Sequence, residues 1–209
     1  MLLLDARDVI LALAGLVFAY PWAMLALGRR HTPLLAALST LALSLGALTL
    51  GMLALLLIDA LRPATVGAGM GIVFAAGMAL LARREMLPRW RVRSDLRSAI
   101  ARLRQHPWEA IALVVIVAML ALVTFNLVYW PFNADDAVSI YAMQSRVIFE
   151  TRALPDDGGL YDAYPMLVPL GYTYAHLVAG EVNEYLALGF GAALSIAAFG
   201  AAGALGATL

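Results

Sequence analysis

The stretch that decides the fold lies at residues 110–134 and reads AIALVVIVAMLALVTFNLVYWPFNA. It carries no formal charge at neutral pH, and it is longer than the roughly 20 residues that a helix needs to cross about 30 Å of hydrocarbon. Backbone polar groups in lipid must be hydrogen-bonded within the chain, so a segment of this kind is expected to be helical. The stretch therefore predicts a transmembrane helix.

Four other charge-free stretches repeat this pattern, at Val9–Gly28, His31–Ile58, Pro63–Ala82 and Tyr185–Leu209. Over the 209 residues, 63% are hydrophobic and 13% are charged, whereas about a quarter of the residues in a soluble domain are charged. The sequence thus predicts an all-α integral membrane protein with about five transmembrane helices. In the first of them, Pro21 predicts a kink because proline removes one helical hydrogen bond.

Composition also excludes some classes of function. The formal net charge is zero, so no overall field favours nucleic acid as a partner. The chain has no cysteine, which excludes disulfides and thiolate metal sites. Membrane lipid is the expected partner, together with further membrane helices or a second copy of the chain.

The charges between the spans predict the orientation. Arginine gathers in cytoplasmic loops near span ends, and here it gathers at Arg29–Arg30 and within residues 83–104. The loop that follows residue 134 instead carries eight carboxylates up to Glu184. This alternation places the N-terminus outside, residues 83–104 in the cytoplasm and the long acidic loop on the extracytoplasmic side.

The basic segment divides the chain into three predicted regions. Residues 1–82 form a three-span membrane region, and residues 83–108 form an Arg-rich cytoplasmic segment with an amphipathic surface helix at Ser94–Arg104. Residues 109–209 hold a span, the acidic loop and a last apolar run. Because that run reaches Leu209 without a charged flank, we expect this chain to be the N-terminal portion of a larger protein.

The acidic loop contains the candidate site. Asp135 and Asp136 follow the fourth predicted span, and either could cap a helix that begins near Ala137. Arg146 and Glu150 are expected to form an ion pair between residues four apart on this helix. The positions that share its other face at spacings of three and four are Ala137, Ile140, Tyr141, Gln144, Val147 and Ile148.

A second helix is predicted from the segment Tyr164–Gly180, which lacks formal charge but contains Pro165, Pro169 and His176. The segment is slightly short for a span, so it predicts a juxtamembrane helix that is either a surface or a re-entrant one. If it does span, the final apolar run reverses its orientation. A lone histidine in such a segment is expected at the interface rather than as a ligand.

Two motifs of this loop resemble a known family. Residues 136–150 read DAVSIYAMQSRVIFE and, after Leu154-Pro155, residues 164–170 read YPMLVPL. They look like the first extracytoplasmic loop of the GT-C superfamily of membrane glycosyltransferases, nearest to bacterial members of the protein O-mannosyltransferase and aminoarabinose transferase type. In that family a span leads into an acidic motif, two juxtamembrane helices and a Pro-containing motif. The resemblance covers roughly residues 109–209.

The resemblance implies hexosyl or pentosyl transfer from a polyprenyl-phosphate donor to an extracytoplasmic acceptor at the bacterial cytoplasmic membrane. It implies that Asp136 activates the acceptor or helps to hold a divalent ion, and Asp135 could serve instead. Paired carboxylates could share Mg²⁺ or Mn²⁺ as a cofactor, and the leaving phosphate needs positive charge. The candidate substrate-binding residues are Arg146, Arg152, Tyr164, Pro165 and His176.

Two functions from other classes remain open. A non-catalytic membrane subunit or scaffold would pack small-residue spans against partner helices, and Gly67 and Gly71 have the GxxxG spacing that permits close approach. General richness in glycine and alanine is the simpler explanation of that spacing. A transporter is less favoured, because none of the five apolar runs contains an Asp, Glu or Arg.

Overall fold

The computed structural model describes residues 5–28, 33–86, 137–155 and 166–206, and single positions between 105 and 125. All regular structure among the described residues is helical, as predicted. The elements in chain order are α1 (Ala6–Val17), α2 (Tyr20–Leu27), α3 (Pro33–Leu57), α4 (Pro63–Arg83), the π-helix η1 (Ala137–Ala142), α7 (Met143–Thr151), α8 (Leu167–Ala179) and α9 (Glu184–Gly206).

Three helical stretches of the described chain are long and apolar enough to cross a membrane, namely Ala6–Leu27, Leu35–Leu57 and Pro63–Arg83. They correspond to the first three predicted spans. The fourth, Ala110–Ala134, lies largely outside the described residues, and the fifth corresponds to α9. A total of five spans therefore stays a prediction, while a protein with three candidate membrane helices is what the described residues support.

The first of these stretches is broken into α1 and α2, as Pro21 predicts. The proline lies in the first turn of α2, where its missing N–H would have had no helical partner. The break leaves the amide of Ala19 free to donate to the hydroxyl of Ser44 on α3, at 3.0 Å. A buried polar side chain thus satisfies a backbone group that the break exposes.

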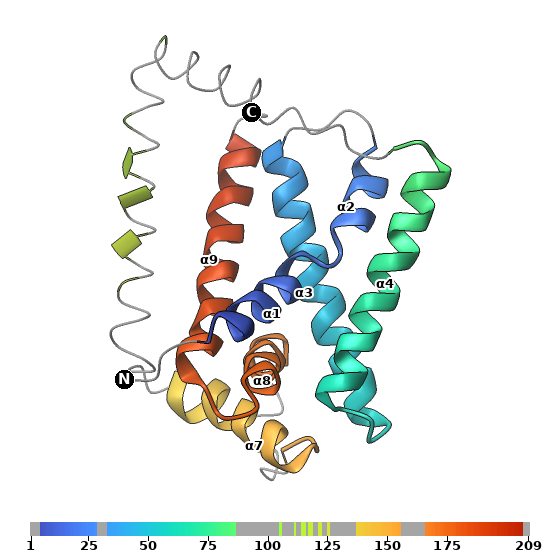
Figure 1. Cartoon of the computed structure of the whole chain (residues 1–209). Coiled ribbons are helices and arrows are strands. Elements are labelled where there is room, and N and C mark those ends of the chain that lie inside the picture. The colour runs from blue at the N-terminus through green and yellow to red at the C-terminus, as the bar shows by residue number, and fades with distance from the viewer. Residues whose placement is uncertain are drawn as a thin grey trace.

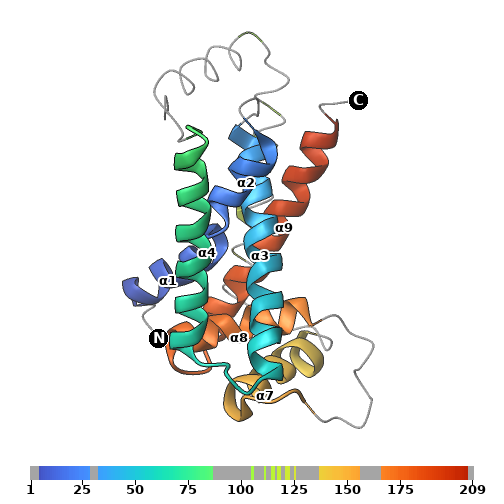
Figure 2. The ribbon, with the colours of Figure 1, turned by 90° about the vertical axis from the view of Figure 1, so that its right-hand side faces the viewer.

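The two ends of the helical bundle differ in what they carry. Figures 1 and 2 show α7 and α8 lying across one end, where the α3–α4 turn also lies and where α9 begins. The opposite end holds the C-terminal ends of α2 and α4: Arg29–Arg30 follow α2 in the sequence, Arg83 ends α4 and Arg84 follows it. The Arg-rich connections therefore leave from one end and the acidic loop from the other. Which end faces the cytoplasm stays a prediction.

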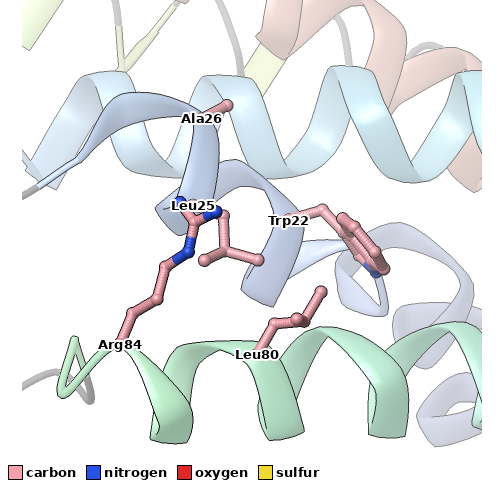
Figure 3. Close-up of a pocket in the computed structure, with 5 residues that line it drawn as sticks. All are labelled: Trp22, Leu25, Ala26, Leu80 and Arg84. Atoms are coloured by element: carbon pink, nitrogen blue, oxygen red, sulfur yellow. The ribbon is translucent and has the colours of Figure 1, made fainter.

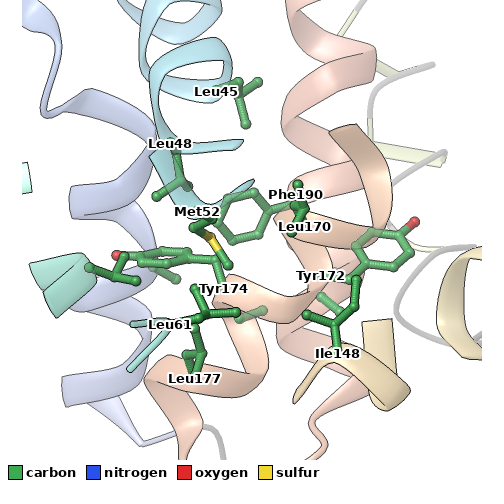
Figure 4. Close-up of a cluster of buried hydrophobic side chains, with 14 of the residues drawn as sticks. Leu45, Leu48, Met52, Leu61, Ile148, Leu170, Tyr172, Tyr174, Leu177 and Phe190 are labelled. Atoms are coloured by element: carbon green, nitrogen blue, oxygen red, sulfur yellow. The ribbon is translucent and has the colours of Figure 1, made fainter. Parts of the chain in front are cut away.

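Helix α8 is buried at the centre of its end of the bundle. Residues 169–177 are all buried, and the helix packs among α1, α3, α7 and α9. Figure 4 shows Leu170 and Tyr174 of α8 beside Phe190 of α9. The predicted short helix therefore forms within Tyr164–Gly180 but is covered by other helices of the protein, and its surface or re-entrant position in the membrane stays a prediction. The physical reason is that α8 has no charged side chain that would hold one face in water, so other helices can cover it on all sides.

One hydrophobic core joins helices from both predicted membrane regions. It includes Leu45 and Met52 of α3 together with Ile148 of α7 and Phe190 of α9. The described parts of residues 1–82 and 109–209 are thus packed against each other within the same core.

The contact between α1 and α8 is tight. The Tyr174 hydroxyl donates to the backbone oxygen of Leu11 at 2.7 Å. A Cβ atom at Gly15 would lie 2.8 Å from Cζ of the same ring, so no side chain fits between the two helices there.

Candidate functional site

The helix predicted after the Asp pair forms where the sequence places it. The π-helix η1 begins at Ala137, and α7 continues to Thr151. On the predicted inner face, Ile140, Gln144 and Ile148 are buried, and Tyr141 and Val147 are half-buried.

The opposite face of α7 carries the predicted ion pair. Nε of Arg146 lies 3.2 Å from Oε1 of Glu150, and both side chains are more than half exposed. An exposed pair of this kind stabilises a helix by only about 0.3–0.5 kcal/mol. It therefore orders the two side chains but contributes little to the stability of the fold.

Part of the predicted site lies outside the described residues. Asp135, Asp136, Tyr164 and Pro165 belong to this part, and their roles stay predictions. The chain nevertheless places Asp136 next to the described helix, because Asp136 is joined directly to Ala137, the first residue of η1. The site predicted at the Asp pair is therefore next to the N-terminal end of the η1–α7 helix.

His176 is buried within the protein, with only 2% of its surface exposed, while its predicted position at the membrane interface stays a prediction. It lies on the α8 face that contacts α7 and the start of α9. The backbone N–H of Asn183 donates to its Nδ1 at 3.1 Å, and its Nε2 lies 3.4 Å from Oγ of Ser145 on α7. These contacts offset the cost of burying a polar ring.

These hydrogen bonds determine which nitrogen carries the proton. Because Nδ1 accepts the bond from Asn183, the proton of the neutral imidazole is on Nε2. The hydroxyl of Ser145 donates to the backbone oxygen of Ala142 at 2.8 Å. The His176 N–H therefore points to the Ser145 oxygen as a donor, which is the reverse of a base that removes a serine proton. The arrangement stabilises the α7–α8 contact and does not form a nucleophile–base pair.

The electrostatic surroundings also keep His176 neutral. Burial, and after it the positive charge of Arg146, together lower the pKa of His176 to about 4, against a smaller opposing effect of the backbone at Asn183. A protonated ring would leave the amide of Asn183 without its acceptor. At neutral pH this histidine can neither donate a positive charge to a phosphate nor exchange a proton easily, so we assign it a structural role.

Arg152 lies at the C-terminal end of α7, in the left-handed region with φ of +58°. Its Cζ is 4.7 Å from the ring centroid of Phe149, and that ring contacts the His176 ring edge-on with centroids 5.8 Å apart. Burial lowers the pKa of the Arg152 guanidinium, and its Nη1 is buried without a hydrogen-bond partner among the described residues. Arg152 and His176, both predicted to bind substrate, are thus joined through Phe149.

Four buried polar residues near this contact were not predicted to take part in the site. Ser145 and Gln144 lie on α7, Thr173 lies on α8, and Asn183 precedes α9. Thr173 donates to the backbone oxygens of Ser145 and Pro169, at 3.2 and 2.8 Å.

The sequence contained a signal for three of these residues, since Gln144 already lies on the predicted inner face of the helix. Ser145 is four residues after Tyr141, at the spacing that defines the buried face. Asn183 stands directly before an apolar run, which is typical of a helix cap, and its Oδ1 accepts from the amide of Leu186 at 3.0 Å. The contact between Asn183 and His176 had no such signal, because it depends on how α8 turns into α9.

Among the residues that the structure describes, no group of three or more His, Asp or Glu could hold a metal ion. The carboxylates predicted to share Mg²⁺ or Mn²⁺ are Asp135 and Asp136, outside that part of the chain. In comparisons with known proteins, no family model, curated protein or solved structure matches this chain. The fold and the site define a class only: an all-helical protein with three candidate membrane helices and two short helices packed across one end.

Proposed function

We propose that this protein is a GT-C-like glycosyltransferase of the bacterial cytoplasmic membrane. It would pass a sugar from a polyprenyl-phosphate donor to an acceptor on the extracytoplasmic side. The observation that carries the proposal is the pair of short helices, η1–α7 and α8, packed across one end of the long apolar helices. The first begins at the residue after Asp136, in the order that the resemblance of residues 136–150 and 164–170 implies.

In this proposal Asp136 provides the chemistry. Its carboxylate accepts the proton of the acceptor hydroxyl or amine while the acceptor attacks the anomeric carbon, and the bond from that carbon to the phosphate oxygen breaks. A divalent ion shared with Asp135 would supply charge for the departing phosphate. The Asp pair is attached to a helix that the α7–α8 contact holds in place, which supports a role in which position matters.

The length of the helix distinguishes the two arginines. Fifteen residues of η1–α7 separate Asp136 from Arg152, which is roughly 20 Å at about 1.5 Å per helical residue. The two side chains cannot both contact the phosphate and the acceptor at one sugar. Arg146 lies about 9 Å closer to the Asp pair along the same helix, and its side chain is 60% exposed. Arg146 is therefore the better candidate for binding the donor phosphate, and Arg152 stabilises the end of α7.

The central test is sugar transfer from a labelled polyprenyl-phosphate donor by the full-length protein. Asp136→Asn should lower the transfer rate by about two or more orders of magnitude if the carboxylate is the base or a metal ligand. Asp59→Asn is the matched control, because Asp59 is an exposed carboxylate in the α3–α4 turn at the same end of the bundle. If Asp135→Asn and Asp136→Asn both retain wild-type rates, the proposed function is wrong.

The arginines give a second test in the same assay. Arg146→Gln should raise the KM for the donor several-fold without unfolding the protein, because the side chain is exposed and its pair with Glu150 contributes little stability. Arg152→Gln should leave the KM unchanged and lower the stability instead, since it removes the contact with Phe149. The opposite pattern would contradict the assignment based on helix length.

A non-catalytic scaffold is the second candidate, and one observation favours it. Gly67 and Gly71 lie on an exposed side of α4, where an added Cβ would meet nothing within 4 Å. Glycines at this spacing allow a partner helix to approach closely in lipid. Gly67→Leu together with Gly71→Leu should abolish assembly in native membranes if this candidate is right, and should leave sugar transfer unchanged if the enzyme acts without that contact.

A further inference from the structure

A groove lies between α2 and α4, at the end of the bundle opposite to α7 and α8. Its volume is about 330 Å³ and it is open on one side. Figure 3 shows the arrangement, with Arg84 reaching from the end of α4 toward Leu25, and Leu80 closing the other side near Trp22. The five residues that line the groove are Trp22, Leu25, Ala26, Leu80 and Arg84.

The groove exists because the two helices touch closely one turn before it. A Cβ at Gly77 would lie 2.8 Å from Nε1 of Trp22, and the same nitrogen donates to the backbone oxygen of Val73 at 2.8 Å. Leu80 and Arg84 follow Gly77 at spacings of three and seven, on the same face of α4. Gly77 lets α4 touch α2 directly, whereas the longer side chains of Leu80 and Arg84 line an opening between the two helices. Trp22, whose single polar atom is already bonded, offers an apolar wall.

The charge at the groove is positive. No described residue forms a hydrogen bond or ion pair with the guanidinium of Arg84. The adjacent charged residues are Arg83, which is exposed, and Glu85, so the three together carry one net positive charge. In the sequence, Arg29 and Arg30 follow the end of α2 directly.

We propose that this groove binds one anionic phospholipid, with an acyl chain against Trp22, Leu25 and Leu80 and the headgroup phosphate on Arg84. The planar guanidinium matches two phosphate oxygens at once. The groove also lies at the ends of two helical stretches that could cross a membrane, the level at which lipid headgroups meet basic residues. A soluble phosphate would leave the apolar walls without a partner, and a zwitterionic headgroup lacks the net charge that complements Arg84.

Trp22 provides a direct readout, because it forms part of the groove wall. The full chain with Trp90, Trp108 and Trp130 replaced by Phe leaves Trp22 as the sole tryptophan. In phosphatidylcholine bilayers, phosphatidylglycerol with brominated chains should quench Trp22 at about one fifth of the mole fraction that brominated phosphatidylcholine requires. This ratio corresponds to about 1 kcal/mol for one arginine near the membrane surface.

The variants separate a specific site from general attraction. Arg84→Gln should remove the preference for phosphatidylglycerol, and Arg84→Lys should retain much of it. Arg83→Gln, the matched control beside the groove, should change the preference by less than twofold. Ala26→Leu should fill the groove and reduce quenching by both lipids, while circular dichroism checks that each variant keeps its helices.

Three results would overturn the proposal. The first is equal quenching of Trp22 by the two brominated lipids in the parent chain. The second is an equal effect of Arg83→Gln and Arg84→Gln, which would indicate diffuse attraction to an anionic surface. The third is displacement of brominated phosphatidylglycerol by millimolar glycerol phosphate, which would identify a site for a soluble phosphate instead of a lipid.

Discussion

His176 should remain neutral over the pH range in which an ordinary histidine titrates. Its ring is buried, its Nδ1 accepts the amide of Asn183, and its Nε2 proton faces Ser145. Protonation in place would put a second N–H against the amide of Asn183 and add a positive charge near that of Arg146. His176→Gln removes the titrating ring while keeping a polar side chain that can bond to Ser145.

The expected effect on stability follows from the difference between the two pKa values. An unfolded histidine has a pKa of about 6.5, whereas the pKa of His176 in the folded protein is about 4. Between these values the unfolded state binds more protons, so the free energy of unfolding decreases as the pH falls. From pH 7.5 to pH 4.5 this decrease is on the order of 2 kcal/mol. Well above pH 6.5 the ring is neutral in both states and contributes no pH dependence.

The measurement is unfolding by sodium dodecyl sulfate in mixed micelles, followed by circular dichroism at pH 7.5 and pH 4.5. The wild-type protein should lose about 2 kcal/mol more than His176→Gln between the two pH values. The carboxylates are common to both proteins, so their titration cancels in this comparison, and His31→Gln is the matched control. Equal pH dependence in wild type and His176→Gln, or a ring that titrates near 6.5 in a nitrogen-15 spectrum, would refute the reasoning.

Two further predictions concern helix packing and orientation. Gly15→Ala should lower the free energy of unfolding by about 1–3 kcal/mol in the same titration, because the methyl group would overlap the ring of Tyr174; Gly51→Ala, where a Cβ meets nothing within 4 Å, should not lower it. Arg93→Cys and Gly158→Cys, made singly, should react with an impermeant thiol reagent from opposite sides of the membrane, and reaction from the same side would contradict the predicted orientation.

The sequence predicted the long helices well because their limits are set by local chemistry. The runs His31–Ile58 and Pro63–Ala82 correspond to α3 and α4 within about two residues, since charged and proline residues mark the positions at which an apolar helix can end. The break near Pro21 and the inner face of α7 also followed from local rules. Each of these features depends on neighbours within one or two turns of the same helix.

The environment of α8 could not be predicted in this way. A short helix without charge is equally compatible with a surface, re-entrant or buried position, and packing against other helices decides among them. The contact that fixes α8 joins Tyr174 to Leu11, across 163 positions of sequence. The burial of His176 could not be predicted for the same reason, because the residues that bury it come from α7 and from the start of α9. The spacing of residues along α7 predicted which of its faces is buried, but it could not predict that α8 covers that face.

The positions of the helix ends also bear on the part of the chain between α4 and η1. Helix α4 ends at Arg83 on one end of the bundle, and η1 begins at Ala137 on the other. The intervening sequence connects these two helix ends, which lie at opposite ends of the bundle. Within it, Ala110–Ala134 is long enough as a helix for a single passage, at about 1.5 Å per residue. The fourth predicted span would make this connection and stays a prediction, as does the position of the Asp pair on the extracytoplasmic side.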